Sequence, residues 1–249
     1  MTQDFLREYP EVGVDKRQHH WIIAIDGPSG AGKSTVAKRL AKQLSYLYVD
    51  TGAMYRAIGL KALRDNPKLD DTSKIASIAQ GSTIELVDSP EGCRVFLDGN
   101  EVTEAIRAEP VSQAASIVSG VSDVRRVLVH AQQQMGARRD VVLEGRDIGT
   151  KVFPNANLKI FLDASERTRA QRRYEENLRK GVTLTLEETL AEISERDRRD
   201  SQRADSPLVR AEDAVYLDTS GKTIEEVLQE ILKLVEKVQK DEVRSTKDE

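Results

Sequence analysis

The chain has 249 residues, of which 39% are hydrophobic and 32% charged, with a formal net charge of −4. This composition is typical of a soluble globular protein, and its mixed charge gives no electrostatic reason to expect a nucleic-acid or membrane partner. The single cysteine, Cys93, excludes an internal disulfide and a cysteine cluster for zinc, and no stretch approaches membrane-spanning length, so we expect a cytoplasmic protein. Residues 1–20 have no clear period, and we expect a leader rather than a secretory signal.

The strongest motif is a stretch that fits the phosphate-loop pattern of glycine, four residues, glycine, lysine, then serine or threonine. Its residues are Gly27, Pro28, Ser29, Gly30, Ala31, Gly32, Lys33, Ser34 and Thr35. A β-branched apolar run at 21–26 predicts a buried strand before it, and Val36, Leu40 and Leu44 recur at helical spacing after it. This context disfavours an ordinary glycine-rich turn. We expect loop amides to hold a phosphate chain, Lys33 to reach its β- and γ-phosphates, and the Ser34 hydroxyl to hold Mg²⁺.

A second short strand is predicted at 46–50, and a helix begins near Ala53. In a doubly wound sheet, ligands lie beyond the carboxyl ends of the strands, so Asp50, Thr51 and Arg56 are expected to face the same crevice as Lys33. Arg56 is therefore a candidate phosphate contact. The alternative is an exposed arginine on the helix surface.

The hydrophobic period changes to two between residues 83 and 102, where Asp98-Gly99 is a hairpin signal. This pattern predicts a small antiparallel meander, with one turn at 89–92, inserted at a loop of an alternating strand and helix chain. Helical spacing returns at 111–118 and 124–134, and a third buried strand at 141–143 leads into Glu144, Arg146 and Asp147.

A fourth strand at 158–163 precedes a basic helical region that Gly181 interrupts, and a second helix starts near Leu186. On that helix Arg196, Arg199, Asp200 and Arg203 fall within about one 100° arc, so the four side chains are expected to share a face. A solvated helix with ion pairs four residues apart, such as Arg196 with Asp200, is the alternative. A fifth strand at 214–218, a last helix at 224–238 and a frayed, charged tail complete the pattern.

These elements predict a three-layer α/β core with a mostly parallel sheet. The Asn-Lys-x-Asp segment that reads guanine in a GTPase is absent from the interior of the chain. Transfer between two phosphorylated molecules depends on positioning and on charge neutralisation, which require arginines from several segments. Arg56, Arg146 and Arg203 could serve an acceptor phosphate, and the arginine-rich helix pair could close over the donor.

The sequence resembles the bacterial cytidylate kinases of the nucleoside monophosphate kinase family. The resemblance rests on five segments that together span about residues 22–218, namely 25–35, 50–56, 144–154, 159–164 and 195–203. It implies a P-loop nucleoside triphosphate hydrolase core with a five-stranded parallel sheet, a small antiparallel insert that binds the monophosphate, and a helical lid. The expected division is a leader at 1–20, core at 21–80, 109–168 and 201–240, insert at 81–108, lid at 169–200, and tail at 241–249.

The same resemblance implies the residues of the site. Lys33, Arg146, Arg196 and Arg203 are expected to act in catalysis, with ATP on residues 27–35. The acceptor site is expected to comprise Thr51, Arg56, Ser116, Arg125, Arg146, Asp147, Asp200 and Arg203. In the family pattern the residues matching Ser116, Arg125 and Asp147 read the base, and the residue matching Asp200 reads the ribose. Glu144 stands where related kinases often carry aspartate, and its expected role is to orient Mg²⁺ through water.

The reaction that this resemblance implies is direct in-line transfer of the γ-phosphoryl group of ATP to CMP or dCMP, with Mg²⁺ as cofactor. Nothing in the sequence resembles a coiled coil or an obligate interface, so we expect a monomer. Two alternatives stay open from the residues. One is a kinase of the same architecture for another small acceptor. The other is a nucleic-acid-stimulated ATPase that uses the basic helices as a strand-binding surface, although the acidic net charge and an aromatic content of only 4% disfavour it.

Overall fold

The computed structural model describes residues 20–65, 68–89 and 92–245, and its centre is a parallel sheet of five strands in the order β2-β6-β1-β7-β8. The strands are β1 (Ile22–Asp26), β2 (Leu47–Asp50), β6 (Val141–Gly145), β7 (Leu158–Asp163) and β8 (Val215–Asp218). The predicted five-stranded parallel sheet is therefore confirmed. Because β1 is the middle strand, the loop that follows it lies at the centre of the carboxyl edge, where ligands bind in such sheets.

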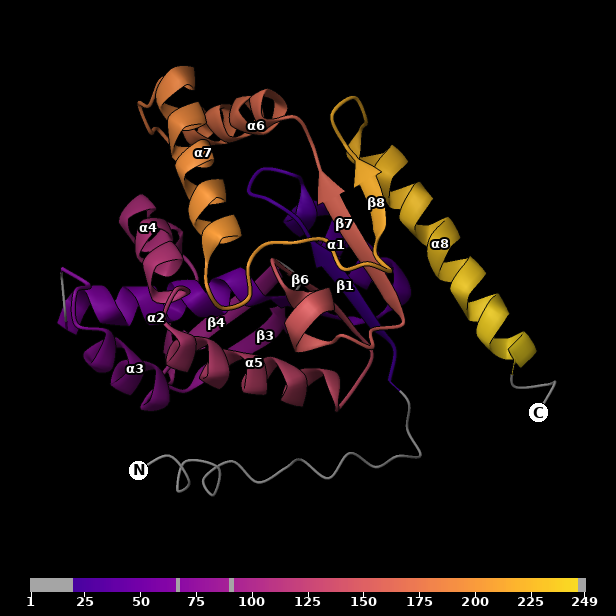
Figure 1. Ribbon diagram of the computed structural model, residues 1–249, viewed down its shortest axis with the longest axis horizontal. Coiled ribbons are helices and arrows are strands. Elements are labelled where there is room, and N and C mark those ends of the chain that lie inside the picture. Colours follow the sequence, from indigo (N-terminus) through magenta and orange to yellow (C-terminus); the bar gives the residue numbers. More distant parts are fainter. Residues whose placement is uncertain (1–19, 66–67, 90–91, 246–249) are drawn as a thin grey trace.

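Helices cover both faces of this sheet, which explains why its inner strands are continuous apolar runs. On one face α1 (Lys33–Leu44) and α8 (Ile224–Ser245) pack against the sheet through Val36, Leu40 and Ile231. On the other face the core contains Ile148 and Val152, from a single π-helical turn, Ile148–Val152. Figure 1 shows α8 beside β8 at one edge of the sheet.

A helical layer on the β2 side carries the insert. It comprises α2 (Thr51–Asp65), α3 (Thr72–Gln80), α4 (Glu109–Val118) and α5 (Ser122–Gly136). Between α3 and α4 lies the predicted antiparallel meander, formed by β3 (Ile84–Ser89), β4 (Gly92–Leu97) and β5 (Asn100–Glu101), and a short 3-10 helix, Ala105–Arg107, follows. Asp98 and Gly99 have φ values of 51° and 77°, so the Asp-Gly pair forms the left-handed hairpin turn that its sequence predicts. Residues 90–91 of the other predicted turn lie outside the described residues.

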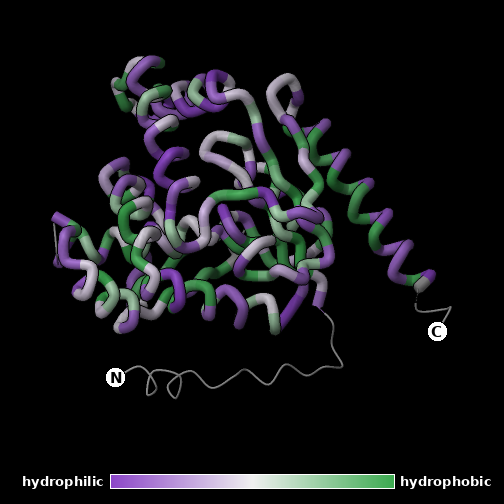
Figure 2. The backbone as a smooth tube through the Cα atoms, in the orientation of Figure 1, coloured by the Kyte–Doolittle hydropathy of each residue, from purple (hydrophilic) through white to green (hydrophobic). Residues whose placement is uncertain are grey.

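Two hydrophilic helices, α6 (Glu166–Arg179) and α7 (Leu186–Gln202), form a hairpin above the carboxyl edge of the sheet (Figures 1 and 2). Gly181 has a φ of 75°, a left-handed conformation that ends the first helix. A capping box between Thr185 and Glu188 starts the second helix. The hairpin is therefore defined by local signals at both ends of its turn.

Two of the α-helices differ from the predicted pattern. Helix α3 is not among the predicted elements; its short apolar face (Ile75, Ile78) follows an Asp71 side chain that caps it by accepting from the Lys74 amide at 2.9 Å. Helix α8 continues to Ser245 rather than ending near residue 238, because its charged residues are good helix formers and Lys240 pairs with Glu236 one turn back at 3.6 Å. Residues 1–19 of the expected leader at 1–20, and the end of the expected tail, 246–249, lie outside the described residues. Within the described ranges, no helix is long and apolar enough to cross a membrane.

Candidate active site

The loop between β1 and α1 has the backbone conformation of a phosphate cradle. Gly27, Gly30 and Gly32 have φ values of 147°, 78° and 91°, which side chains rarely permit. A Cβ on Gly27 would lie 1.9 Å from the Leu162 carbonyl oxygen, so this position also has no room for a side chain. Gly32 is the N-cap of α1 and makes no side-chain hydrogen bond, so no capping side chain occupies the first amides of the helix.

Lys33 is buried at the start of α1, and its Nζ donates to the Pro28 carbonyl oxygen at 2.7 Å. Burial and the nearby guanidinium groups of Arg146 and Arg196 lower the pKa of Lys33 to about 7. The positive charges of these two arginines therefore disfavour the protonated form of the lysine. A polyanion in the loop would relieve that repulsion and favour the ammonium form.

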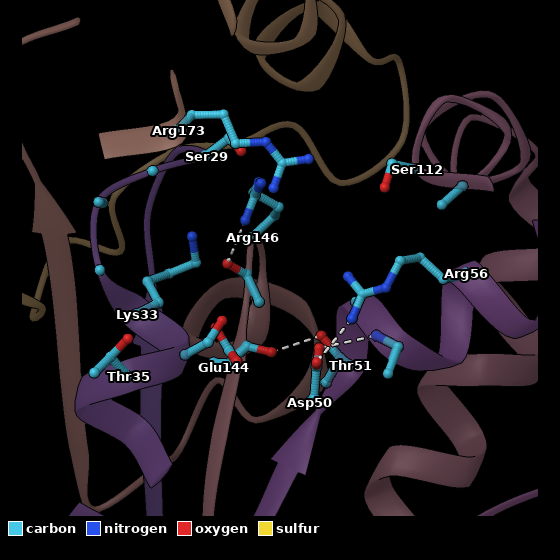
Figure 3. A pocket seen from close by; sticks show the side chains of 18 of the residues that line it. Ser29, Lys33, Thr35, Asp50, Thr51, Arg56, Ser112, Glu144, Arg146 and Arg173 are labelled. Carbon is cyan, nitrogen blue, oxygen red and sulfur yellow. Dashed lines mark hydrogen bonds and ion pairs between the residues drawn. The ribbon is translucent and has the colours of Figure 1, made fainter. Parts of the chain in front are cut away.

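Glu144 connects the phosphate loop to β2. Its carboxylate accepts from the Ser34 hydroxyl at 2.9 Å and from the Tyr48 hydroxyl, while its carbonyl oxygen accepts from the Thr51 hydroxyl at 2.7 Å. Burial, and then the nearby Asp50 carboxylate, raise the pKa of Glu144 above its usual range. Figure 3 shows Lys33, Glu144, Asp50 and Thr51 along one wall of the pocket.

Asp50, at the end of β2, orients Arg56 on the next helix. One carboxylate oxygen accepts from the Ala53 amide at 2.8 Å, and the other accepts from the Arg56 guanidinium at 2.8 Å. Burial would raise the pKa of Asp50, but the Arg56 charge, the hydrogen bonds from Ala53 and Arg56, and the Lys38 charge together hold the pKa below its usual value. The pair places the guanidinium at the cavity wall, as Figure 3 shows.

Arg125 and Asp147 form a buried ion pair, with exposed side-chain fractions of only 3% and 6%. The Arg125 guanidinium also donates to the Ser119 carbonyl oxygen at 3.3 Å and lies 5.5 Å from the centre of the Tyr55 ring. The Ser116 hydroxyl is buried and has no hydrogen-bond partner. A guanidinium, a carboxylate and an unsatisfied hydroxyl therefore line this end of the cavity.

Helix α7 brings a second group of charges over the carboxyl edge. The Arg146 Nε donates to Asp200 Oδ2 at 3.0 Å, and Arg203 lies 3.9 Å from the other oxygen of the same carboxylate. Arg203 also donates to the Ser119 hydroxyl at 3.1 Å. Burial and the adjacent Arg146 lower the pKa of Arg196 to about 10.

Arg199, the fourth residue of the predicted arc, does not join this group at the cavity. Its Nε lies 3.4 Å from a carboxylate oxygen of Glu195, one turn back on the same helix, and it is absent from the cavity lining. A local ion pair therefore directs the side chain away from the site, although its backbone position falls on the predicted arc.

The structure brings the predicted residues together around one cavity of about 760 Å³, which all of them line except Gly27 and Pro28. Among the described residues, eight buried side-chain nitrogen or oxygen atoms lack a hydrogen-bond partner. Five of these atoms belong to cavity-lining residues, namely Tyr55, Ser116, Arg125, Arg196 and Arg203. Buried polar groups without partners are costly, so this concentration indicates a polar ligand.

Sequence reasoning missed several lining residues. Tyr55 lies inside a recognised segment but is an aromatic residue at helical spacing, which is typical of a core position. Arg172 belongs to the predicted basic region, where no pattern distinguishes it from its neighbours. Its guanidinium donates to the Thr219 hydroxyl at 3.0 Å and to the Thr219 carbonyl oxygen at 2.6 Å, near the phosphate loop. Only the fold brings these two segments together.

Comparison with known proteins places the chain in one family. The family model described as cytidylate kinase matches residues 23–237. A protein named cytidylate kinase from Bacillus subtilis (strain 168) is 51% identical over 214 residues, covering 86% of this chain and 96% of the relative. A namesake from Caldanaerobacter subterraneus subsp. tengcongensis is 50% identical over 221 residues, covering 89% and 97% of the two chains. This chain belongs to the cytidylate kinase family.

Proposed function

We propose that this protein transfers the γ-phosphoryl group of ATP to CMP or dCMP, giving ADP and CDP or dCDP. The observation that carries the proposal is a single cavity with the phosphate loop at one end and the Arg125–Asp147 pair with the Ser116 hydroxyl at the other. The names of the relatives support the same reaction.

The donor would bind on residues 27–35. Loop amides and the N-terminus of α1 would hold the phosphates, and Lys33 would contact the β- and γ-phosphates. The side chain of Arg172 and the segment around Thr219 lie at the same end of the cavity and would flank the rest of the nucleotide.

Ser34 and Glu144 fit a magnesium ion that arrives with the nucleotide. A hydroxyl and a carboxylate that lie 2.9 Å apart beside the phosphate loop are hard oxygen ligands of the kind that Mg²⁺ prefers. Ser34 would ligate the ion directly and Glu144 would hold it through water. When bound with ATP, Mg²⁺ would reduce the charge on the β- and γ-phosphates.

The acceptor phosphate would lie between the arginines of three segments, Arg56, Arg146 and Arg203. Lys33, Arg146, Arg196 and Arg203 would neutralise the charge that builds up as the two phosphates approach in line. The acceptor oxygen is already anionic, so no side chain has to remove a proton from it. The transfer would proceed without a covalent intermediate on the protein.

Selectivity for cytosine follows from donors and acceptors. The exocyclic amino group of cytosine would donate to Asp147, while N3 and O2 would accept from Arg125 and Ser116. Uracil would instead present a carbonyl oxygen to the Asp147 carboxylate. A mispaired buried polar group costs about 1–3 kcal/mol, which corresponds to roughly tenfold to a hundredfold in selectivity per contact. Thr51 would line the acceptor site and Asp200 would contact the ribose.

We further propose that residues 169–200 act as a lid and residues 81–108 as the monophosphate-binding insert of a monomer, with core at 21–80, 109–168 and 201–240. Arg173 of α6 pairs with Glu109 of α4 at 3.1 Å, a contact between lid and acceptor side that supports closure over the cavity. Closure would exclude water, which otherwise competes with the acceptor for the γ-phosphoryl group.

The test is ADP formation from Mg-ATP with CMP, without an acceptor, and with single-stranded DNA in place of CMP. Turnover that depends on CMP and is lost in Lys33→Ala supports the proposal. Near-normal activity of Lys33→Ala would contradict the role of the loop, and stimulation by DNA alone would favour the ATPase alternative.

A further inference from the structure

The side chain of Asp26, the last residue of β1, accepts hydrogen bonds from the backbone of the two residues that follow Asp147. Its side chain is buried, with Oδ1 accepting from the Ile148 amide at 2.9 Å and Oδ2 accepting from the Gly149 amide at 2.8 Å. One carboxylate thus satisfies the first two amides of the π-helical turn Ile148–Val152. No role in the proposed reaction has been assigned to this residue.

The turn that Asp26 contacts, Ile148–Val152, is tightly packed around Gly149. A Cβ on Gly149 would lie 3.1 Å from Lys159 Cδ and 3.5 Å from Asp26 Oδ2. The turn is completed by backbone bonds from the Lys151 amide to the Asp147 carbonyl oxygen and from the Phe153 amide to the Ile148 carbonyl oxygen, at 2.8 and 2.7 Å. The position of the Ile148 amide therefore restricts where the preceding residue can direct its carboxylate.

Asp26 also adjoins the phosphate loop, because Gly27 follows it directly, and a Cβ on Gly27 would lie 1.9 Å from the Leu162 carbonyl oxygen. Strands β1 and β6 are paired in parallel, with Asp26 opposite Gly145. The carboxylate thus crosses from the strand that starts the donor loop to the segment that carries Asp147. It is the kind of fixed contact that orients a binding group through the backbone.

We propose that Asp26 is a positioning residue that fixes the Asp147 carboxylate for cytosine recognition. The inference rests on the proposed function, since it assigns the reading of the base to Asp147.

The charge of Asp26 supports this role. Burial raises the pKa of Asp26 to about 6, with a smaller contribution from Asp147, whereas the two amides and the Lys33 charge act in the opposite direction. The ionised carboxylate accepts from both amides, which opposes the cost of burying its charge. An asparagine would accept one of the two amide bonds and turn its NH₂ group towards the other amide.

The experiment compares Asp26→Asn with Asp140→Asn. Asp140 is the control because its side chain, although more exposed, also accepts from a backbone amide, that of Trp21 at 2.8 Å, at the other end of β1. We measure thermal unfolding, equilibrium binding of CMP and of a non-hydrolysable ATP analogue, and the ratio of kcat/KM for CMP over UMP. In Asp26→Asn we expect CMP binding weakened about tenfold and the CMP over UMP ratio reduced, with ATP-analogue binding changed less than about twofold.

A double-variant cycle shows whether Asp26 acts through Asp147. The reduction of the CMP over UMP ratio by Asp26→Asn should disappear in an Asp147→Asn background, because the group being positioned is then changed. Unchanged CMP binding in Asp26→Asn, or equal weakening of CMP and ATP-analogue binding together with lower thermal stability, would overturn the proposal. The wild-type protein failing to prefer CMP is a separate result that contradicts the proposed function instead.

A measurement on the wild-type protein covers the case in which Asp26→Asn does not fold. Coupling is reciprocal, so CMP should slow hydrogen exchange at the Ile148 and Gly149 amides if holding these amides favours CMP. The ATP analogue alone should have a smaller effect. No change with CMP, or equal slowing by both nucleotides, would contradict the role of Asp26.

Discussion

The Ser34 hydroxyl donates to the Glu144 carboxylate at 2.9 Å, although 110 positions separate the two residues in the chain. Parallel pairing of β1 with β6 places Glu144 opposite Ile25, just before the phosphate loop. The longer side chain of glutamate reaches Ser34 with one oxygen and the buried Tyr48 hydroxyl with the other. Glu144 is therefore oriented by a hydrogen bond from Tyr48 on β2. Comparing residue 144 alone with its counterpart in related kinases does not reveal this partner.

This relationship predicts that Tyr48→Phe weakens binding of the divalent cation without affecting CMP. Loss of the tyrosine hydroxyl frees Glu144 to rotate, so its orientation towards the ion becomes less favourable. We expect a few-fold weaker Mn²⁺ affinity of the ADP complex, measured by electron paramagnetic resonance, and Glu144→Gln should show a larger loss. Unchanged affinity in both variants would exclude Glu144 from the cation site.

The lowered pKa of Lys33 predicts that the protein takes up a proton when ATP binds. Its pKa is lowered to about 7 in the free protein, so at pH 8 most molecules carry a neutral amine. Bound phosphates favour the charged form, and the site should take up close to one proton at pH 8, with less uptake as the pH falls below 7. Calorimetry in buffers of different ionisation enthalpy measures this uptake. The same uptake in Lys33→Met would show that another group is responsible.

The buried Arg125–Asp147 pair predicts a large stability effect when one partner is removed. Arg125→Met leaves the Asp147 carboxylate buried without its counter-charge, which should reduce the free energy of unfolding by about 3–5 kcal/mol. Adding Asp147→Asn should restore much of that loss but not CMP binding. Urea denaturation and CMP titration of the three proteins distinguish the two effects, and a double variant no more stable than Arg125→Met would contradict the pairing.

Replacing Ser116 should weaken CMP binding without lowering the stability of the protein. Its hydroxyl is buried without a partner, so Ser116→Ala should leave thermal stability equal to or above that of the wild type. The same change should weaken CMP binding by about fivefold to tenfold, because a contact to the base is lost. Ser119→Ala is the comparison, since its hydroxyl donates to the Ser116 carbonyl oxygen and accepts from Arg203. A destabilised Ser116→Ala with normal CMP affinity would assign this serine a structural role only.

The sequence was most informative where function depends on consecutive residues. Lys33 and Ser34 follow a loop whose glycines and flanking strand are all local. Asp50 and Glu144 lie at the ends of predicted strands, whose carboxyl ends share one edge of a parallel sheet. Ser116 and Arg125 are polar positions on helices, and only the resemblance to a family identified them. The roles of these residues stay predictions that the variants above can test.

Contacts between distant side chains could not be predicted. The bonds from Asp26 to the Ile148 and Gly149 amides, and from Tyr48 to Glu144, depend on which strands become neighbours and on how far each side chain extends. Arg199 shows that a correctly predicted helix position does not determine where the side chain lies. Its helical position was predicted correctly, yet a neighbouring glutamate determines where its guanidinium lies.

The central claim is tested most directly by ADP formation from Mg-ATP with the acceptor varied across CMP, dCMP, UMP, AMP, GMP and dTMP, with a control that lacks an acceptor. We expect fast turnover confined largely to CMP and dCMP, because these acceptors present an amino group to Asp147. Comparable turnover with UMP or a purine monophosphate, or no acceptor-dependent turnover despite ATP binding, would contradict the assignment of Ser116, Arg125 and Asp147 to the cytosine base.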